Sequence, residues 1–315
     1  MNTSPLVLQL ASIGPLADES LATEFKAVRF WELDDGAQWL DQFGADVVVV
    51  ATSVRAGCNA ALISRLPHLG AVCSWGVGFD TIDVAAAAAR GIQVSVTPNV
   101  LDDCVADMAW ALLLATARRL GAADRYVRDG QWQRLGEFPL STRVSSKRLG
   151  ILGLGRIGAA IARRGAGFSM AIAYHGRRPR EGVPYRFEPS LRALAEWSDF
   201  LVVACPGGDQ TRHLVSSEVL QALGLRGILV NVSRGSVVDT AALVDALESG
   251  RLGGAGLDVV EGEPGAPVAL RGRDDVVLSP HVSSATVETR QAMEQLVVDN
   301  VRAYLQSGQV ATPIA

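Results

Sequence analysis

The chain has 315 residues, of which 49% are hydrophobic and 20% are charged, and its formal net charge is −4. This composition is typical of a globular protein with room for two domains, and it excludes a fibrous or disordered chain. The small negative charge argues against a general nucleic-acid-binding surface, so we expect no nucleic-acid partner.

The sequence carries no evident sorting signal and no metal-binding pattern. The amino terminus lacks a basic stretch followed by an apolar one, and apolar runs such as 106–117 are too short to span a bilayer. The cysteines show no C-x-x-C spacing, which indicates reduced core residues: Cys58, Cys73, Cys104 and Cys205. We therefore expect a cytoplasmic protein with no membrane association and no metal.

Strand-like and helix-like segments alternate through the first third of the chain. Helices are predicted at 58–66 and 82–90. The predicted strands between them are continuous apolar runs, at 6–10, 28–31, 46–50, 70–74 and 92–95. Runs without polar alternation are typical of strands buried on both faces, as in a parallel sheet covered by helices.

A second alternating series follows residue 148, with strands predicted at 149–152, 171–174, 200–204, 228–232, 256–260 and 276–278. The fold class is therefore α/β, with two doubly wound parallel sheets. Apolar helices over 98–120 and 283–306 are expected to carry the chain into the second unit and back again. This organisation makes 1–98 plus 284–315 one discontinuous domain, with 99–283 inserted in it.

A glycine-rich turn follows the predicted strand at 149–152 and precedes an alanine-rich helical segment. Gly153 permits a tight turn, Gly155 lets a pyrophosphate approach the backbone, and Gly158 lets the helix pack closely on the strand. The helix amino terminus offers free N–H groups and partial positive charge to the phosphates. The segment predicts dinucleotide binding.

The end of the next strand distinguishes between the two nicotinamide dinucleotides. NAD enzymes place an acid there, whereas this chain has His175, Arg177, Arg178 and Arg180. Arginines hold a 2′-phosphate that an acid would repel, so the segment predicts NADP(H), with His175 near the ribose. The alternative reading is a solvated basic turn.

Three polar residues follow late strands of the second sheet, where open α/β sheets place their ligands. Arg234 suits the carboxylate and carbonyl of a 2-oxo acid, and His281 suits proton donation near neutral pH. Glu263 beside that histidine would favour its charged form. Taken singly, each could instead be structural, and His68, His175 and His213 are expected to lack such a carboxylate partner.

Four blocks of sequence resemble the signatures of the D-isomer-specific 2-hydroxyacid dehydrogenases. They are Gly153-Leu-Gly-Arg-Ile-Gly158, Asn231-Val-Ser-Arg-Gly-Ser236, Gly256-Leu-Asp-Val-Val-Glu-Gly-Glu-Pro264 and Ser279-Pro-His-Val-Ser283. The resemblance covers nearly the whole chain. It implies a Rossmann cofactor domain inserted in a flavodoxin-like substrate domain, and a homodimer.

The resemblance also assigns further site residues. Backbone amides of Val77 and Gly78 are expected to hold the substrate carboxylate, and Asp258 to contact the nicotinamide carboxamide. The remaining residues expected to contact the cofactor are Arg156, Ile157, Cys205, Pro206, Thr211, Val232, Ser233 and Ser283. Two departures stand out, since Ser283 replaces a common glycine and Cys205-Pro-Gly-Gly replaces a more usual Pro-Leu-Thr.

Within the family, 174–180 and 132–139 most resemble the NADPH-using glyoxylate/hydroxypyruvate reductases and hydroxyphenylpyruvate reductases. We therefore expect reduction of a small 2-oxo acid to a D-2-hydroxy acid (EC 1.1.1.-). A phosphoglycerate-dehydrogenase-like enzyme is the nearest alternative. A cofactor-sensing, corepressor-like binding protein is an alternative from another class.

Overall fold

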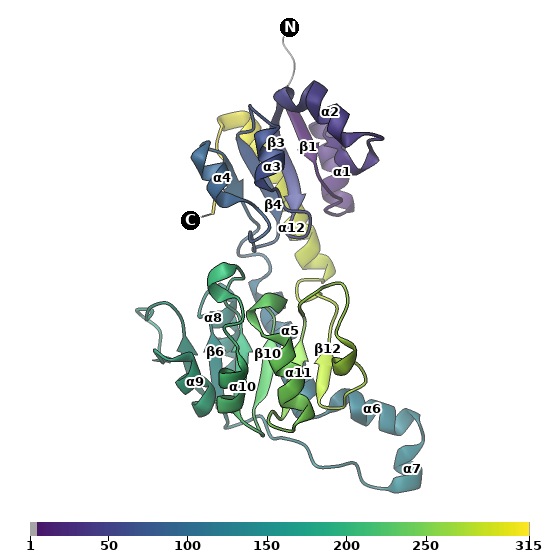
Figure 1. The fold of residues 1–315 in the computed structure, drawn as a ribbon, viewed down its shortest axis with the longest axis vertical. Coiled ribbons are helices and arrows are strands. Elements are labelled where there is room, and N and C mark those ends of the chain that lie inside the picture. Colours follow the sequence, from purple (N-terminus) through teal and green to yellow (C-terminus); the bar gives the residue numbers. More distant parts are fainter. Residues whose placement is uncertain (1–4, 315) are drawn as a thin grey trace. The chain divides into compact units, whose positions relative to one another are not determined.

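The computed structural model describes residues 5–314, which form two compact units (Figure 1). One unit takes in the described residues up to Leu101 and those from Ser284 onward. The other is formed by Asp102–Ser283, so it is inserted in the chain of the first.

The first unit is built on a five-stranded parallel sheet in the order β2-β1-β3-β4-β5, a flavodoxin-like order. Its strands are β1 (Leu6–Gln9), β2 (Val28–Arg29), β3 (Val47–Ser53), β4 (Ala71–Trp75) and β5 (Gln93–Ser95). One face packs against α1 (Pro15–Glu24) and α12 (Val287–Ser307). The other packs against α2 (Gly36–Phe43), α3 (Ala60–Ser64) and α4 (Val84–Ala89).

The second unit is built on a seven-stranded parallel sheet in the order β12-β11-β10-β9-β6-β7-β8. Counted from β6, this is the doubly wound order of dinucleotide-binding domains. The strands are β6 (Arg148–Leu152), β7 (Ala171–His175), β8 (Arg186–Phe187), β9 (Phe200–Val203), β10 (Ile228–Asn231), β11 (Gly254–Leu257) and β12 (Val276–Leu278). The predicted fold class is confirmed.

Helices cover both faces of the seven-stranded sheet (Figure 1). One face carries α5 (Asp102–Ala117) and α8 (Arg156–Gly167). The other carries α9 (Leu191–Trp197), α10 (Ser217–Leu223) and α11 (Thr240–Glu248). Within residues 5–314, no helix combines the length and the apolar character that crossing a membrane requires.

Several element boundaries differ from the sequence prediction. The single helix expected over 98–120 is shorter, since α5 ends at Ala117 and Arg119 adopts a left-handed conformation with φ +50°. The last helix begins at Val287 rather than 283, because the Thr286 side chain caps it. Strand β11 ends at Leu257 rather than at 260, and the residues that follow form the loop that contains Glu263.

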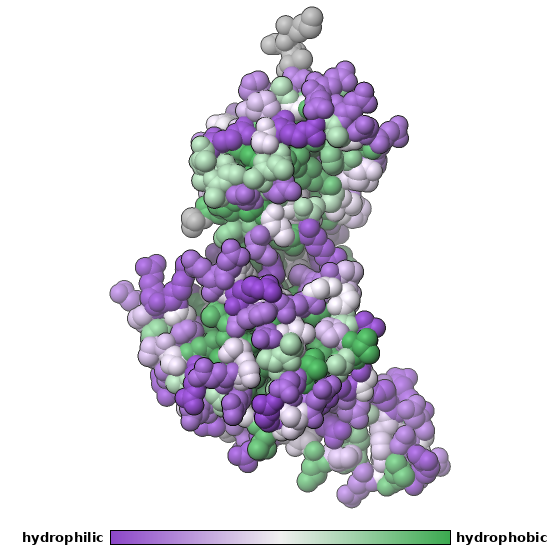
Figure 2. All heavy atoms as spheres, in the orientation of Figure 1, coloured by the Kyte–Doolittle hydropathy of each residue, from purple (hydrophilic) through white to green (hydrophobic). Residues whose placement is uncertain are grey.

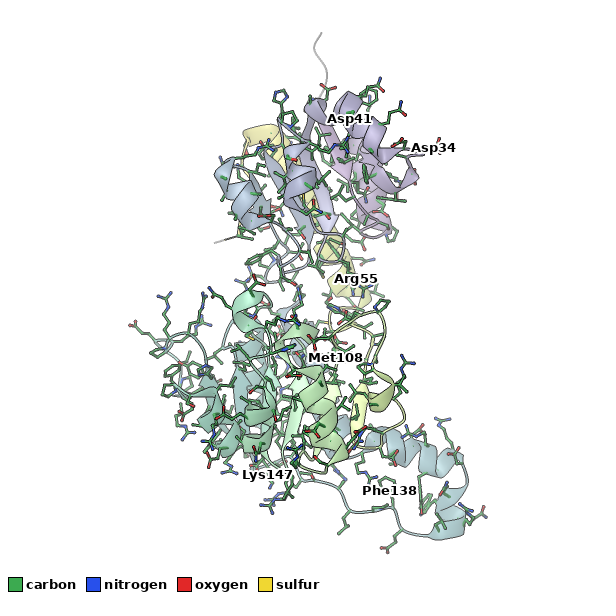
Figure 3. The ribbon with its side chains drawn as sticks, viewed as in Figure 1. Asp34, Asp41, Arg55, Met108, Phe138 and Lys147 are labelled. Carbon is green, nitrogen blue, oxygen red and sulfur yellow. The ribbon has the colours of Figure 1, made fainter. Side chains whose placement is uncertain are left out.

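An arm extends from the seven-stranded unit and is formed by α6 (Leu120–Arg128), α7 (Gln131–Leu135) and the stretch to residue 140 (Figure 1). Phe138, labelled in Figure 3, lies in that last stretch. Its ring packs edge-on against Tyr126 at 5.3 Å, and the Arg119 guanidinium lies 5.3 Å from the ring centre. These aromatic and cation–π contacts pack the stretch after α7 against α6 and the residue before it.

Candidate active site

The glycine-rich turn after β6 contains two glycines that sterics require. A Cβ on Gly153, which has φ +96°, would lie 2.6 Å from the backbone of Cys205 in the loop after β9. A Cβ on Gly158 would lie 2.1 Å from the carbonyl oxygen of Gly153. Both positions therefore exclude any side chain, as the sequence pattern predicts.

Gly155 differs, because a Cβ there would meet no atom within 4 Å. It immediately precedes Arg156 and Ile157, the first residues of α8, so the helix amino terminus faces open space beside it. An open backbone surface at a helix amino terminus fits a pyrophosphate. Arg156 Nε lies 3.5 Å from Asp102, whose pKa is raised by burial despite the attraction of Arg156.

At the end of β7, the ring of His175 is held by its Nδ1 atom, 2.8 Å from the carbonyl oxygen of Glu188. Arg177 and Arg178 follow and are exposed. Within the described part of the chain, neither guanidinium has a hydrogen bond or an ion pair. Both are therefore available to an anionic ligand.

Arg180 has a role that the sequence analysis did not assign. Its backbone N–H donates to the Tyr174 hydroxyl at 2.7 Å, and its guanidinium donates to the carbonyl of Leu154 in the glycine-rich turn. The basic segment is thereby fixed against the turn. The sequence groups Arg180 with the arginines expected at the 2′-phosphate, and nothing in the local pattern marks Leu154 as its partner.

The loop after β9 holds Cys205, Pro206 and Thr211. Cys205 is buried, and this burial raises the pKa of its thiol to about 11, so the thiol is protonated at neutral pH. The Thr211 hydroxyl donates to the carbonyl of Pro206 at 2.9 Å, which closes the loop. A Cβ on Gly207 would lie 2.5 Å from the Arg234 side chain, so this departure from the family pattern makes room for that arginine.

The loop after β10 is shaped by Asn231, whose side-chain oxygen accepts from the backbone N–H of Ser233 at 3.0 Å. The Asn231 amide donates to the carbonyl of Arg234 at 2.9 Å. Val232 and Ser233 are buried, and the Arg234 guanidinium donates to the carbonyl of Ser233 at 2.8 Å. The short polar side chain of Asn231 thus fixes the backbone that presents Arg234.

Glu263 and His281 come together, as predicted. Glu263 Oε2 lies 2.7 Å from His281 Nδ1, and Glu263 Oε1 accepts from the backbone N–H of Val260 at 3.2 Å. Engagement of Nδ1 by a carboxylate keeps a proton on that nitrogen, so Nε2 is the ring atom that can exchange a proton with a substrate. Both side chains remain partly exposed, so the pair is reachable by a substrate.

Asp258 anchors the loop that carries His281. Asp258 is 1% exposed, and one oxygen of its carboxylate accepts from the Ser279 hydroxyl (2.6 Å) and the Val282 N–H (2.9 Å). The other oxygen accepts from the backbone N–H (3.0 Å) and the hydroxyl of Ser283. These bonds fill its acceptor sites. The expected contact between Asp258 and the nicotinamide stays a prediction.

One expectation about the histidines is wrong. His213 does have a carboxylate beside it, since its Nε2 lies 2.8 Å from Glu261 Oε1. Burial raises the pKa of Glu261, but hydrogen bonds from His213 and Thr240 outweigh it and hold that pKa below its usual 4.5. The partners are 48 residues apart, and nothing in the local sequence marks them as neighbours.

Val77 and Gly78 belong to the five-stranded unit and follow β4. Gly76 before them has φ +124°, and its N–H donates to the Thr97 hydroxyl at 3.1 Å. Within residues 5–314, the N–H groups of Val77 and Gly78 make no hydrogen bond, so both can serve a ligand. Their role towards a substrate carboxylate stays a prediction.

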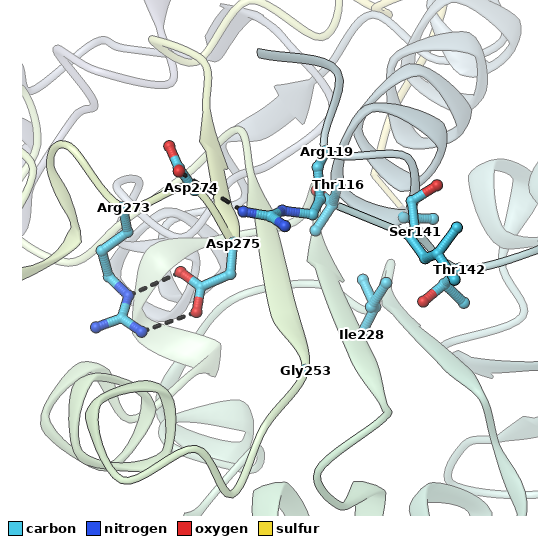
Figure 4. A pocket seen from close by; sticks show the side chains of 11 residues that line it. Thr116, Arg119, Ser141, Thr142, Ile228, Gly253, Arg273, Asp274 and Asp275 are labelled. Carbon is cyan, nitrogen blue, oxygen red and sulfur yellow. Dashed lines mark hydrogen bonds and ion pairs between the residues drawn. The ribbon is translucent and has the colours of Figure 1, made fainter. Parts of the chain in front are cut away.

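The seven-stranded unit also has a cavity of about 470 Å³ at the opposite edge of its sheet (Figure 4). Ile228 and Gly253, at the amino ends of β10 and β11, line it together with Arg119 and an Arg273–Asp275 ion pair of 2.8 Å. None of the predicted site residues line it. Ligands of open α/β sheets bind at the carboxyl ends of strands, so we place no active site here.

The doubly wound sheet, the open glycine-rich turn and the Glu263–His281 pair beside the Arg234 loop define a nicotinamide-dinucleotide-dependent oxidoreductase. The family description "D-isomer specific 2-hydroxyacid dehydrogenase, NAD binding domain" matches residues 110–283. The chain belongs to this family, which confirms the resemblance seen in the sequence.

Individual relatives extend the match to nearly the whole chain. A glyoxylate/hydroxypyruvate reductase of Arabidopsis thaliana is 46% identical over 98% of both chains, and a hydroxyphenylpyruvate reductase of Plectranthus scutellarioides is 43% identical over 98% of both. An NADPH-dependent glyoxylate/hydroxypyruvate reductase of Sinorhizobium meliloti, solved with NADP and malonate, superposes with a TM-score of 0.91. It is 44% identical, and the alignment covers 99% of this chain and 97% of that one.

Proposed function

We propose that this protein reduces small 2-oxo acids, such as glyoxylate and hydroxypyruvate, to D-2-hydroxy acids with NADPH. The observation that carries the proposal is the 2.7 Å contact between Glu263 and His281, which leaves Nε2 of the histidine for proton transfer. The similarity to reductases of these acids from two organisms supports the substrate class.

The cofactor supplies a hydride to the carbonyl carbon when bound. We assign its pyrophosphate to the open backbone at Gly155 and its 2′-phosphate to Arg177 and Arg178, which have no protein partners in the described chain. The remaining cofactor contacts are those that the family resemblance assigns.

The chain's own residues bind the acid and move the proton. Arg234 holds the substrate carboxylate and polarises the carbonyl, with Val77 and Gly78 as further carboxylate donors. His281 donates its Nε2 proton to the carbonyl oxygen as that oxygen gains negative charge. Glu263 stabilises the charged imidazole and fixes its orientation from Nδ1.

Mixing the protein with NADPH and glyoxylate, and following the loss of NADPH absorbance, tests the proposal. We expect turnover with glyoxylate or hydroxypyruvate and a product of D configuration. The hydroxyphenylpyruvate reductase at 43% identity makes aromatic 2-oxo acids the second candidate class. Absence of NADPH oxidation with every member of a panel of both classes would overturn the function.

The proposal includes a homodimer that uses the arm. Five large hydrophobic residues of the arm are exposed: Leu120, Val127, Trp132, Leu135 and Leu140. Figure 2 shows some green, hydrophobic side chains among the hydrophilic ones of the arm. A concentration of exposed apolar residues on one projecting segment is typical of an interface. Sedimentation of the wild type and of a Trp132→Ser, Leu135→Ser variant tests whether the arm forms the dimer interface.

The expected cytoplasmic location of the protein is part of the same proposal.

A further inference from the structure

The second histidine–carboxylate pair, His213 and Glu261, has no part in the chemistry assigned above. Besides the 2.8 Å contact between them, the Arg212 guanidinium lies 3.5 Å from the same Glu261 oxygen. The other oxygen of Glu261 accepts from the backbone N–H of Thr240 at 3.4 Å. Glu261 therefore joins its own loop after β11 to the loop after β9 and to the start of α11.

The pair connects the two loops that lie on either side of the loop that carries Arg234. Strand β10 lies between β9 and β11 in the sheet, so the loops after its neighbours flank the loop after β10. The backbone N–H of His213 donates to the carbonyl of Ser236 at 2.8 Å. A Cβ on Gly235 would lie 2.1 Å from the carbonyl carbon of Val260. The Arg234 loop is thus packed directly against both segments that the pair joins.

Glu261 is also linked to the carboxylate that holds His281. The backbone N–H of Val260 donates to Glu263, and Gly262 between the two glutamates has φ +81°. Residues 260–263 therefore form one turn folded around the Glu263 carboxylate. Because both glutamates belong to this one turn, a displacement of Glu261 would also displace Glu263.

We propose that His213 and Glu261 are a positioning pair for the reduction, whose contact fixes the loops of Arg234 and Glu263 in the arrangement that proton transfer needs. The inference rests on the proposed function. The two side chains are 35% and 26% exposed, and ion pairs with such exposure add little to overall stability. Their effect is therefore local, where a displacement of about 1 Å is enough to slow catalysis strongly.

Leucine and glutamine substitutions separate this role from a general structural one. His213→Leu and Glu261→Leu should each lower kcat about tenfold, because the loops lose their alignment, with the Kd for NADPH changed less than about twofold. His213→Gln keeps a donor and should restore most of the activity. The double leucine variant should be no worse than Glu261→Leu alone, since that single variant already lacks the His213–Glu261 interaction.

A control variant and a second readout complete the test. Arg302→Leu breaks an ion pair of 2.8 Å with Glu24 in the five-stranded unit and should leave kcat unchanged. Hydrogen exchange of peptides covering 232–240 and 258–264 should be faster in His213→Leu and unchanged in Arg302→Leu.

The kinetic measurements and hydrogen exchange together distinguish a failure of the positioning role from a failure of the proposed function. A wild type inactive towards all 2-oxo acids counts against the function, and hydrogen exchange then decides on the pair. Unchanged exchange in both segments of His213→Leu would overturn the positioning role. Additive losses of kcat in the double variant of an active enzyme would overturn it as well.

Discussion

The backbone N–H of His281 donates to the carbonyl of Asp258 at 2.9 Å, and the carboxylate of the same Asp258 holds the residues on either side of that histidine. His281 itself has φ +55°, a conformation that a residue other than glycine adopts at a cost. The buried carboxylate stabilises this backbone. Asp258 is therefore the support on which the orientation of the imidazole depends.

Asp258→Asn should lower both stability and turnover. The amide replaces one acceptor oxygen with a donor that faces two donors of the 279–283 loop. We expect a loss of about 2 kcal/mol in the free energy of unfolding, measured in urea, and a lower kcat. Ser279→Ala, which removes one of these bonds, should cost about 1 kcal/mol. A raised Kd for NADPH with unchanged stability would instead make Asp258 chiefly a cofactor contact.

Gly235→Ala tests the packing of the Arg234 loop. The new methyl would overlap the backbone of Val260, which cannot yield as a flexible side chain would, so we expect a loss of about 1–3 kcal/mol and reduced turnover. Gly167→Ala is the matched control, because a Cβ there meets nothing within 4 Å at the end of α8. Equal melting temperatures for the two variants would argue against the close approach.

Replacing Arg177 and Arg178 by alanine should change cofactor preference. Each guanidinium contributes about 1.5–3 kcal/mol when it hydrogen-bonds a charged group, so KM for NADPH should rise at least tenfold while KM for NADH changes little. Arg226→Ala, an exposed arginine in the turn before β10, is the control. Equal losses with both cofactors would contradict the 2′-phosphate assignment.

Asp199 predicts part of the acid dependence of stability. Burial raises the pKa of Asp199, but hydrogen bonds from the backbone and side chain of Arg148, with the charge of Lys147, bring it below its usual 3.8. A carboxyl group whose pKa is lowered by folding stabilises the protein above its unfolded pKa, and that contribution is lost as pH falls through its folded pKa.

Asp199→Asn should therefore destabilise the protein by about 1 kcal/mol near neutral pH. The difference from the wild type should shrink as the pH falls below 3.8. Thermal melts of both proteins across a pH series measure this. A stability difference between the two proteins that stays constant down to acid pH would show that the charge of Asp199 does not contribute to stability.

The sequence alone predicted the parts of this protein that local patterns determine. Continuous apolar runs indicate buried parallel strands, and they located both sheets, although β11 begins at Gly254, two residues earlier than expected, and ends at Leu257. The two-residue strand β8 was missed, since it is too short to show any pattern. The glycine-rich turn was predictable because backbone sterics fix each of its glycines.

The sequence predicted the site residues that directly follow strands, but it did not predict the contacts between different loops of the site. Arg234, Glu263 and His281 each follow a strand of one parallel sheet, so topology alone brings them to one edge. The contacts of Asp258 with the 279–283 loop and of Glu261 with His213 join loops far apart in sequence. Such contacts depend on loop conformations that no periodic pattern records.

The most direct test of the account is the turnover of His281→Ala with glyoxylate and saturating NADPH, measured beside the Kd for NADPH. Loss of the proton donor should lower kcat by about 10²–10⁴-fold and leave the Kd within about twofold of the wild type. A variant that turns over glyoxylate at the wild-type rate would contradict the assignment of His281 as the general acid.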